Sequence, residues 1–255
     1  MCGIVAYVGP KDAAPILLEG LQRLEYRGYD SAGIAVANRG IKVRKTKGRV
    51  ADLAATVPAR FKGTTGIGHT RWATHGEPSD INAHPHLDAA ERIAVVHNGI
   101  IENADDLRHR LEADGVTFVS ETDTEVIAHL IARAVKETDT LEEAVRMALK
   151  GVVGTYGLAV IDAERPDQVV VARNGSPIVL GLGEKEMFAA SDVAALVRYT
   201  RQVVHLEDGE LAVLRADGFQ TLTMDARVTS KEPLTVDWDA GHYDTGGYEH
   251  YLLKE

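Results

Sequence analysis

Residues 1–10 read MCGIVAYVGP, and this stretch holds the only cysteine of the 255-residue chain, Cys2. The apolar, β-branched run behind Cys2 ends at Gly9-Pro10 and predicts a short buried strand. If Met1 is removed, Cys2 becomes the N-terminal residue and carries a thiol beside a free α-amine, whose reference pKa is about 7.7–8.0. Such an amine can take the proton of the nucleophile. The stretch therefore predicts an N-terminal nucleophile, and an inert buried thiol is the alternative.

The composition is that of an ordinary globular protein, with 45% hydrophobic and 26% charged residues. A formal net charge of −10 argues against a nucleic-acid-binding surface, which needs a basic face. No segment has the roughly 18–20 consecutive apolar residues of a membrane span, and the N-terminus lacks the features of a signal peptide. A single cysteine allows no disulfide within the chain, which is typical of a reducing compartment. We therefore expect a cytosolic location.

The order of predicted elements indicates an α+β fold. Apolar runs predict strands early in the chain, at 2–8, 31–37, 41–47, 65–72 and 92–97. Helical periodicity follows at about 12–26, 103–113, 123–136 and 140–149. After Gly154 the chain is mainly β, with Asp208-Gly209 and Asp217-Gly218 predicted to form tight hairpin turns. Because strands and helices are grouped rather than alternating, we expect stacked antiparallel sheets covered by helices.

Several polar residues stand where a predicted strand ends or a helix begins. Arg71 could bind a carboxylate through its planar guanidinium, or form an ordinary surface ion pair. Asn98-Gly99 offers a side-chain amide beside an unhindered backbone N–H, the donors of an oxyanion hole, but this dipeptide is also a common hairpin turn. Asp123 begins a predicted helix, where an N-cap is the ordinary role.

The histidines are concentrated in one part of the chain, at positions 69, 75, 84, 86 and 97. His84-Pro85-His86 could be a pair of metal ligands. However, the chain has no His-Glu-x-x-His motif and no second cysteine. We therefore expect no metal and no cofactor, and predict that His84 and His86 close or gate a loop. Trp72, at the edge of the same polar loop, could be a core aromatic residue or shield a site from water.

Taken together, Cys-Gly-Ile at 2–4, RGYDSAG at 27–33 and His-Asn-Gly at 97–99 resemble the class II glutamine amidotransferases, which are N-terminal-nucleophile hydrolases. Three longer stretches narrow the resemblance to the glutaminase half of the glucosamine-6-phosphate synthase family. They are LEYRGYDSAG at 24–33, RWATHGEP at 71–78 and NAHPH at 82–86. The sibling amidophosphoribosyltransferases typically have a different loop after the arginine. This resemblance covers nearly the whole chain.

The resemblance implies a four-layer αββα sandwich and a role for each matched residue. Cys2 would be the nucleophile and its amine the general base, while Asn98 and Gly99 would form the oxyanion hole. Arg71 would bind the carboxylate of L-glutamine and Asp123 its α-ammonium. The loop around residues 72–80 would close over the substrate, and the pocket would also be lined by Trp72, Thr74 and His75.

The resemblance also implies the reaction and the partners. Cys2 would form a γ-glutamyl thioester, and the released ammonia would pass to fructose-6-phosphate in a C-terminal sugar isomerase half that is absent here. Residues 1–225 would be the glutaminase domain, and the polar tail 226–255 would begin the linker to that half in a homo-oligomeric enzyme. The alternatives are an amidophosphoribosyltransferase-like glutaminase domain, another N-terminal-cysteine amidase, a glutamine-binding sensor without turnover, and a metal hydrolase.

Overall fold

The computed structural model describes residues 2–73 and 75–237, and its framework is a pair of antiparallel β-sheets. The first sheet has eight strands in the order β15 (Leu234–Thr235), β11 (Gln202–His205), β9 (Val179–Gly183), β10 (Glu186–Ala190), β1 (Gly3–Val8), β4 (Thr65–Arg71), β2 (Ser31–Ala37) and β3 (Ile41–Lys47). The second has seven, in the order β14 (Val228–Thr229), β13 (Gly218–Thr223), β12 (Glu210–Arg215), β8 (Arg165–Asn174), β7 (Gly154–Asp162), β6 (Ile93–Ile101) and β5 (His86–Leu87).

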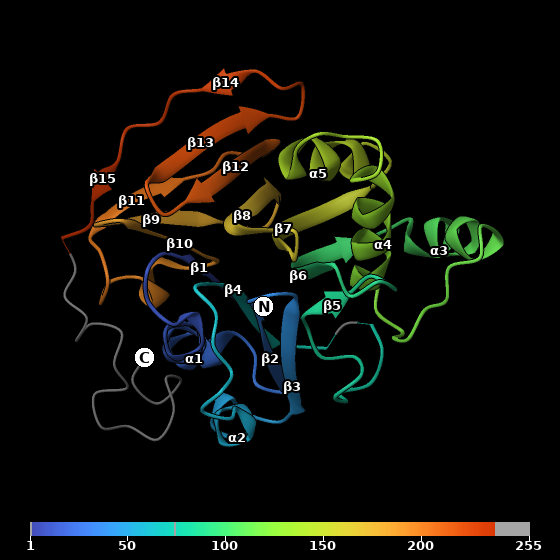
Figure 1. Ribbon diagram of the computed structural model, residues 1–255, viewed down its shortest axis with the longest axis horizontal. Coiled ribbons are helices and arrows are strands. Elements are labelled where there is room, and N and C mark those ends of the chain that lie inside the picture. Colours follow the sequence, from blue (N-terminus) through green and yellow to red (C-terminus); the bar gives the residue numbers. More distant parts are fainter. Residues whose placement is uncertain (1, 74, 238–255) are drawn as a thin grey trace.

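Helices cover the outer face of each sheet, as Figure 1 shows. On the first sheet these are α1 (Ala13–Arg23) and α2 (Val50–Thr56), with short 3₁₀ turns at Glu25–Arg27 and Val193–Ala195. On the second sheet lie α4 (Thr124–Ala134) and α5 (Leu141–Leu149), and α3 (Ala104–Ala113) packs beside α4. No helix within the described ranges is long and apolar enough to span a bilayer.

The strand period of two distributes side chains between three apolar layers. In β1, Ile4, Ala6 and Val8 enter the core between the sheets, whereas Val5 and Tyr7 face α1. In β6, alternate residues likewise point to the sheet interface and to the helices above it. Full burial of one such aliphatic side chain contributes roughly 1.5–3 kcal/mol, so burial on both faces explains why these strands are continuously apolar. The predicted α+β fold, a four-layer αββα sandwich, is confirmed.

The pairing of β1 with β4 places the N-terminus beside the end of β4. Gly3 is opposite Thr70 in the register, so Cys2 lies next to the residues where β4 ends and the loop beginning at Trp72 starts. From the second sheet, β6 passes close to β4 and brings Asn98 to the same place. The two sheets therefore meet at the predicted nucleophile.

Two sequence-based expectations differ from the structure, and some elements were not predicted. Asp208-Gly209 does not form a hairpin turn, because β11 belongs to the first sheet and β12 to the second; the turn carries the chain from one sheet to the other. The strand expected at 92–97 continues to Ile101, since its pairing with β7 is maintained throughout. Helix α2 and the two-residue strand β5 carry no sequence-based prediction. The hairpin at Asp217-Gly218 is confirmed by the pairing of β12 with β13.

Candidate active site

The Cys2 thiol lies against the backbone of Trp72. The N–H of Trp72 donates to Sγ at 3.2 Å, and Sγ is 3.6 Å from the Trp72 carbonyl oxygen. Burial raises the pKa of the Cys2 thiol above its ordinary value, because desolvation disfavours the thiolate. A thiol that stays protonated at neutral pH needs a base at its side to become a nucleophile. Met1 lies outside the described residues, so its removal stays a prediction.

Asn98 and Gly99 lie inside β6, and the alternative of a hairpin turn at this dipeptide is wrong. The Asn98 side-chain amide donates one hydrogen to the Cys2 carbonyl at 3.0 Å, and the amide has a second hydrogen to offer. Gly99 adopts a φ of 130°, a backbone conformation that favours glycine. A Cβ on Gly99 would stand 2.1 Å from the Thr155 carbonyl oxygen. These two residues therefore have the composition and placement of an oxyanion hole beside the thiol.

We predict that Gly99→Ala destabilises the fold by roughly 3 kcal/mol or more, because backbone strain adds to a clash with β7. Gly115→Ala is the matched control, since Gly115 also has a positive φ, 86°, but no atom of the described residues lies within 4 Å of the new Cβ. The control should lose about 1–2 kcal/mol, the cost of the backbone conformation alone. Urea unfolding of both variants measures the difference. Equal losses would show that the close approach to Thr155 is unimportant.

Arg71 and Asp123 are buried charges that have no ionic partner among the described residues. Arg71 is 4% exposed; its Nη2 donates to the carbonyls of His75 and Gly76, while Nη1 has no hydrogen-bond partner among residues 2–73 and 75–237. Asp123 is 8% exposed and accepts the Ile101 N–H at 2.9 Å. Within the same ranges neither residue forms an ion pair. An uncompensated buried charge is costly, so both side chains are suited to a ligand with two opposite charges.

Neither ordinary alternative for these two residues is correct. Arg71 is not a surface arginine in an ion pair. Asp123 occupies the N-cap position of α4, but its carboxylate makes no capping hydrogen bond and is directed to β6 instead. The Arg71 guanidinium and the Asp123 carboxylate can therefore contact a ligand in the cavity.

The loop after β4 begins on the rim of the site. Trp72 is half exposed and meets Tyr29 edge-on, with ring centroids 5.6 Å apart. The next residue, Ala73, donates its N–H to the carboxylate of Asp30. His75 is exposed and its carbonyl accepts from Arg71. Thr74 lies outside the described residues, and its substrate-binding role stays a prediction, as does closure of the loop.

His84 and His86 belong to a buried stack of imidazole rings. His84 stacks on His69 with centroids 4.2 Å apart and meets His86 edge-on at 4.6 Å. Its Nε2 lies 2.8 Å from the hydroxyl of Thr124 at the start of α4. Among the residues described, no three metal-ligating side chains come together. The stack thus joins β4, β5 and the loop before it, and it contacts α4 through Thr124. A gating role for His84 and His86 stays a prediction.

Burial lowers the pKa of four of the histidines, because desolvation disfavours the imidazolium; for His69 the pKa falls to about 3. The others are His84, His86 and His97.

We predict that the protein loses stability steadily below pH 6.5. In the unfolded chain these histidines titrate near 6.5, whereas burial lowers their pKa in the folded state. Because the folded pKa is the lower one, stability is fully present above about pH 6.5 and falls as the pH decreases below it. His69, whose folded pKa is about 3, contributes a loss of about 1.4 kcal/mol per pH unit over this range. Urea unfolding at pH 7.5, 6 and 5 measures the slope. His109→Asn, on an exposed position of α3, is the control and should not change it. Equal stability at pH 7.5 and 5 would contradict the prediction.

These side chains surround a cavity of about 340 Å³. Its wall contains Cys2, Asn98, Gly99, Arg71 and Asp123, so five residues predicted from the sequence share one cavity. The wall also includes Trp72, His75 and His84, whereas His86 lies outside it. A cavity of this size suits a small amino acid.

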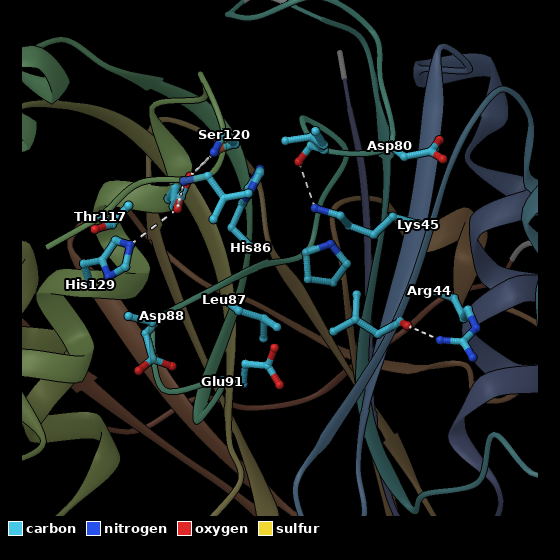
Figure 2. A pocket seen from close by; sticks show the side chains of 16 residues that line it. Arg44, Lys45, Asp80, His86, Leu87, Asp88, Glu91, Thr117, Ser120 and His129 are labelled. Atoms are coloured by element: carbon cyan, nitrogen blue, oxygen red, sulfur yellow. Dashed lines mark hydrogen bonds and ion pairs between the residues drawn. The ribbon is translucent and has the colours of Figure 1, made fainter.

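A larger cavity, of about 600 Å³, is lined by His86 but not by Cys2 (Figure 2). Two of its charged groups are bound within the protein: Lys45 donates to the Ile81 carbonyl at 2.9 Å, and the Asp88 carboxylate accepts three backbone N–H groups. Burial alone would raise the pKa of Glu125, but hydrogen bonds from His129, Ser120 and Val119 lower it to about 2. By size alone, this cavity would be the better candidate for the active site. The reactive groups, however, line the smaller cavity.

Three residues without a role in the sequence-based prediction contact the site. Arg27 donates to the Cys2 carbonyl at 3.2 Å, Asp30 holds the start of the loop, and His69 contacts Asn98. Arg27 and Asp30 belong to the 27–33 stretch, and the charged residues in this short stretch were the sequence feature that could have indicated their place at the site. The contact of His69 joins two sheets and has no local signal.

Comparison with known proteins agrees with this geometry. A family model described as a glutamine amidotransferase domain matches residues 69–198, just over half of the chain. The chain belongs to the glutamine amidotransferase domain family. The resemblance to this family and the classification as a glutamine amidotransferase enzyme are confirmed.

Curated relatives are similar over the whole chain. Two are named glutamine–fructose-6-phosphate aminotransferase [isomerizing]: one from Symbiobacterium thermophilum, 52% identical, and one from Chlorobaculum tepidum, 49% identical. Each alignment covers 100% of this chain and 42% of the relative. A solved structure, the glutamine phosphoribosylpyrophosphate amidotransferase from B. subtilis, superimposes with a TM-score of 0.76 at 26% identity, covering 89% of this chain and 50% of the other. The chain therefore spans less than half of the length of these curated relatives.

Proposed function

We propose that this chain hydrolyses the side-chain amide of free L-glutamine, with Cys2 as the nucleophile. The observation that carries the proposal is that Arg71 and Asp123, buried and without ionic partners among the described residues, share the cavity of the thiol. A free amino acid has one carboxylate and one ammonium group, which these two side chains complement. Peptides lack that pair of charges at one carbon, so the same residues account for specificity.

The reaction begins when the α-amine of Cys2, freed by removal of Met1, takes the thiol proton. Sulfur attacks the amide carbon of glutamine, and the C=O electron pair moves onto oxygen. The second N–H of the Asn98 amide and the backbone N–H of Gly99 stabilise this oxyanion. The tetrahedral intermediate collapses, the C–N bond breaks, and the ammonium form of the amine protonates the leaving ammonia. The product is a γ-glutamyl thioester on Cys2.

Hydrolysis reverses the proton transfers. The amine takes a proton from water, the hydroxide attacks the thioester carbon, and the same donors stabilise the second oxyanion. The C–S bond breaks, the thiol regains its proton and glutamate leaves. One group acts as base and then as acid in each half-reaction, which requires a pKa near the working pH. An α-amine, with a reference pKa of about 7.7–8.0, meets this requirement.

We further propose that, in a longer protein, the ammonia is transferred to fructose-6-phosphate in a C-terminal sugar isomerase half. The names and greater lengths of the curated relatives support this. Residues 1–225 would be the glutaminase domain in this arrangement, and 226–255 would begin the linker; residues 238–255 lie outside the described part of the chain. The expected homo-oligomer and cytosolic location belong to the same proposal. An amidophosphoribosyltransferase-like role is less well supported, since the similar structure is 26% identical.

The test is ammonia release from L-glutamine compared with two analogues that each lack one charge. Glutaramate has no α-ammonium group, and L-glutaminamide has no free carboxylate. We expect kcat/KM to fall by at least about 10²-fold for each, because one buried charge is left without a partner. Equal turnover of all three would indicate a general amidase, and binding without ammonia release would indicate a sensor. Loss of turnover on adding a chelator would indicate a metal hydrolase.

A further inference from the structure

We propose that His69 is a positioning residue, which fixes the Asn98 amide so that its NH₂ group faces the thiol and the reacting amide. The inference rests on the proposed function, since it assigns to His69 the orientation of an oxyanion-hole donor. His69 lies on β4 of the first sheet and Asn98 on β6 of the second, so the contact also connects the two halves of the site.

The orientation of the Asn98 amide follows from the atoms around it. The Cys2 carbonyl oxygen, 3.0 Å from the amide, can only accept a hydrogen bond, so the nitrogen Nδ2 must face it. The amide oxygen Oδ1 then points the other way, and it lies 3.0 Å from Nε2 of His69. In the opposite orientation two oxygens would meet at hydrogen-bond distance.

The tautomer of His69 is fixed by a second acceptor. Nε2 also lies 3.0 Å from the carbonyl oxygen of His97, so its two neighbours are both oxygens that accept. Nε2 therefore carries the proton and donates to both. The other ring nitrogen, Nδ1, is buried and has no hydrogen-bond partner in the described part of the chain, as suits an unprotonated nitrogen. Burial also lowers the pKa of His69 to about 3, so this donor does not change near neutral pH.

The ring of His69 is held in place by its surroundings. It is fully buried and stacks on His84, which Thr124 holds from the other side. Gly33, on the neighbouring strand β2, allows this packing: a Cβ there would stand 2.1 Å from the His84 carbonyl oxygen. A fixed ring with a fixed proton leaves Asn98 with one favourable amide orientation.

We predict that His69→Phe, which keeps a ring but removes the donor, lowers kcat for glutamine about 10- to 100-fold and leaves KM within about twofold. Loss of a whole oxyanion donor costs about 10²–10³-fold, and loss of its orientation should cost part of that. KM should not change, because Arg71 and Asp123 are untouched. His69→Gln can place an amide N–H near the position of Nε2, and should restore most of kcat.

Three measurements separate positioning from a merely structural effect. The first is the rate at which methyl methanethiosulfonate modifies Cys2, a reaction at sulfur that forms no carbonyl oxyanion; we expect it to be unchanged in His69→Phe. The second is affinity for a glutamine-derived aldehyde, whose adduct with the thiol carries such an oxyanion; it should weaken in proportion to kcat. The third is the double variant Asn98→Ala/His69→Phe, which should be no slower than Asn98→Ala alone.

Several outcomes would overturn the inference: an unchanged kcat in His69→Phe, additive losses in the double variant, or parallel losses of kcat and thiol modification. If His69→Phe does not fold, a kcat for His69→Gln below one-tenth of the parent value, with unchanged thiol modification, would also contradict it. Failure of the proposed function would be recognised separately, because the unmodified protein would then release no ammonia from glutamine.

Discussion

Replacing Cys2 with Ala is expected to reduce glutamine hydrolysis by at least about 10⁴-fold while leaving the fold and the binding of glutamine intact. Loss of a nucleophile that acts together with its base costs about this much or more in other hydrolases. The chain has no other cysteine that could substitute for it. Stability should change little, since Cys2 is only half-buried and the hydrogen bonds of its thiol are to the Trp72 backbone. Ammonia release and glutamine binding by calorimetry measure the two parts.

Cys2→Ser is the matched variant for this prediction. Serine is small, so removal of Met1 should proceed as in the parent, and the α-amine remains. Its hydroxyl is a far weaker nucleophile than a thiol under the same base, so we expect a loss nearly as large as for Ala. Full turnover by either variant would show that the nucleophile lies elsewhere.

Replacing Arg71 with Gln is expected to reduce kcat/KM for glutamine by about 10²–10³-fold, mainly through KM. Truncating one partner of a buried charge pair costs about 2–5 kcal/mol, and here the partner would be the substrate carboxylate. Arg71 also donates to the carbonyls of His75 and Gly76, so a change in the loop could imitate this loss. Steady-state kinetics with glutamine and with L-glutaminamide separate the two causes.

L-Glutaminamide has no carboxylate, so its turnover should change by less than about threefold in Arg71→Gln. The control is Arg44→Gln: Arg44 lines the larger cavity, lies over Phe61, and should affect neither substrate. Equal losses for both substrates would mean that Arg71 acts through the loop and not through the carboxylate.

The residues of the candidate site could be predicted because each belongs to a short local pattern. Cys2 opens an apolar strand, Arg71 ends one, and Asp123 begins a helix; the structure places all three at one cavity. Asn98-Gly99 was ambiguous from local chemistry, since the same dipeptide suits a turn. Pairing with β7 decides between the two, and that pairing depends on residues more than 50 positions away.

What could not be predicted depends on tertiary structure. A turn such as Asp208-Gly209 has the same local chemistry whether it joins neighbours in one sheet or connects two sheets. The hydrogen bond between His69 and Asn98 joins residues 29 positions apart on different sheets. The absence of ionic partners for Arg71 and Asp123 within the described ranges also depends on every element around them. Sequence patterns can identify such residues as candidates. Only the packed structure shows which of their polar groups have no protein partner and can therefore bind a ligand.

The central claim is that Cys2, as the N-terminal residue, attacks the side-chain amide of glutamine. The most direct measurement is incubation with an electrophilic glutamine analogue that carries a diazo ketone in place of the amide, followed by peptide mass mapping. We predict one label per chain, on Cys2, in an N-terminal peptide that lacks Met1, with labelling prevented by excess glutamine. Labelling of another residue, or fully active protein that retains Met1, would contradict the account.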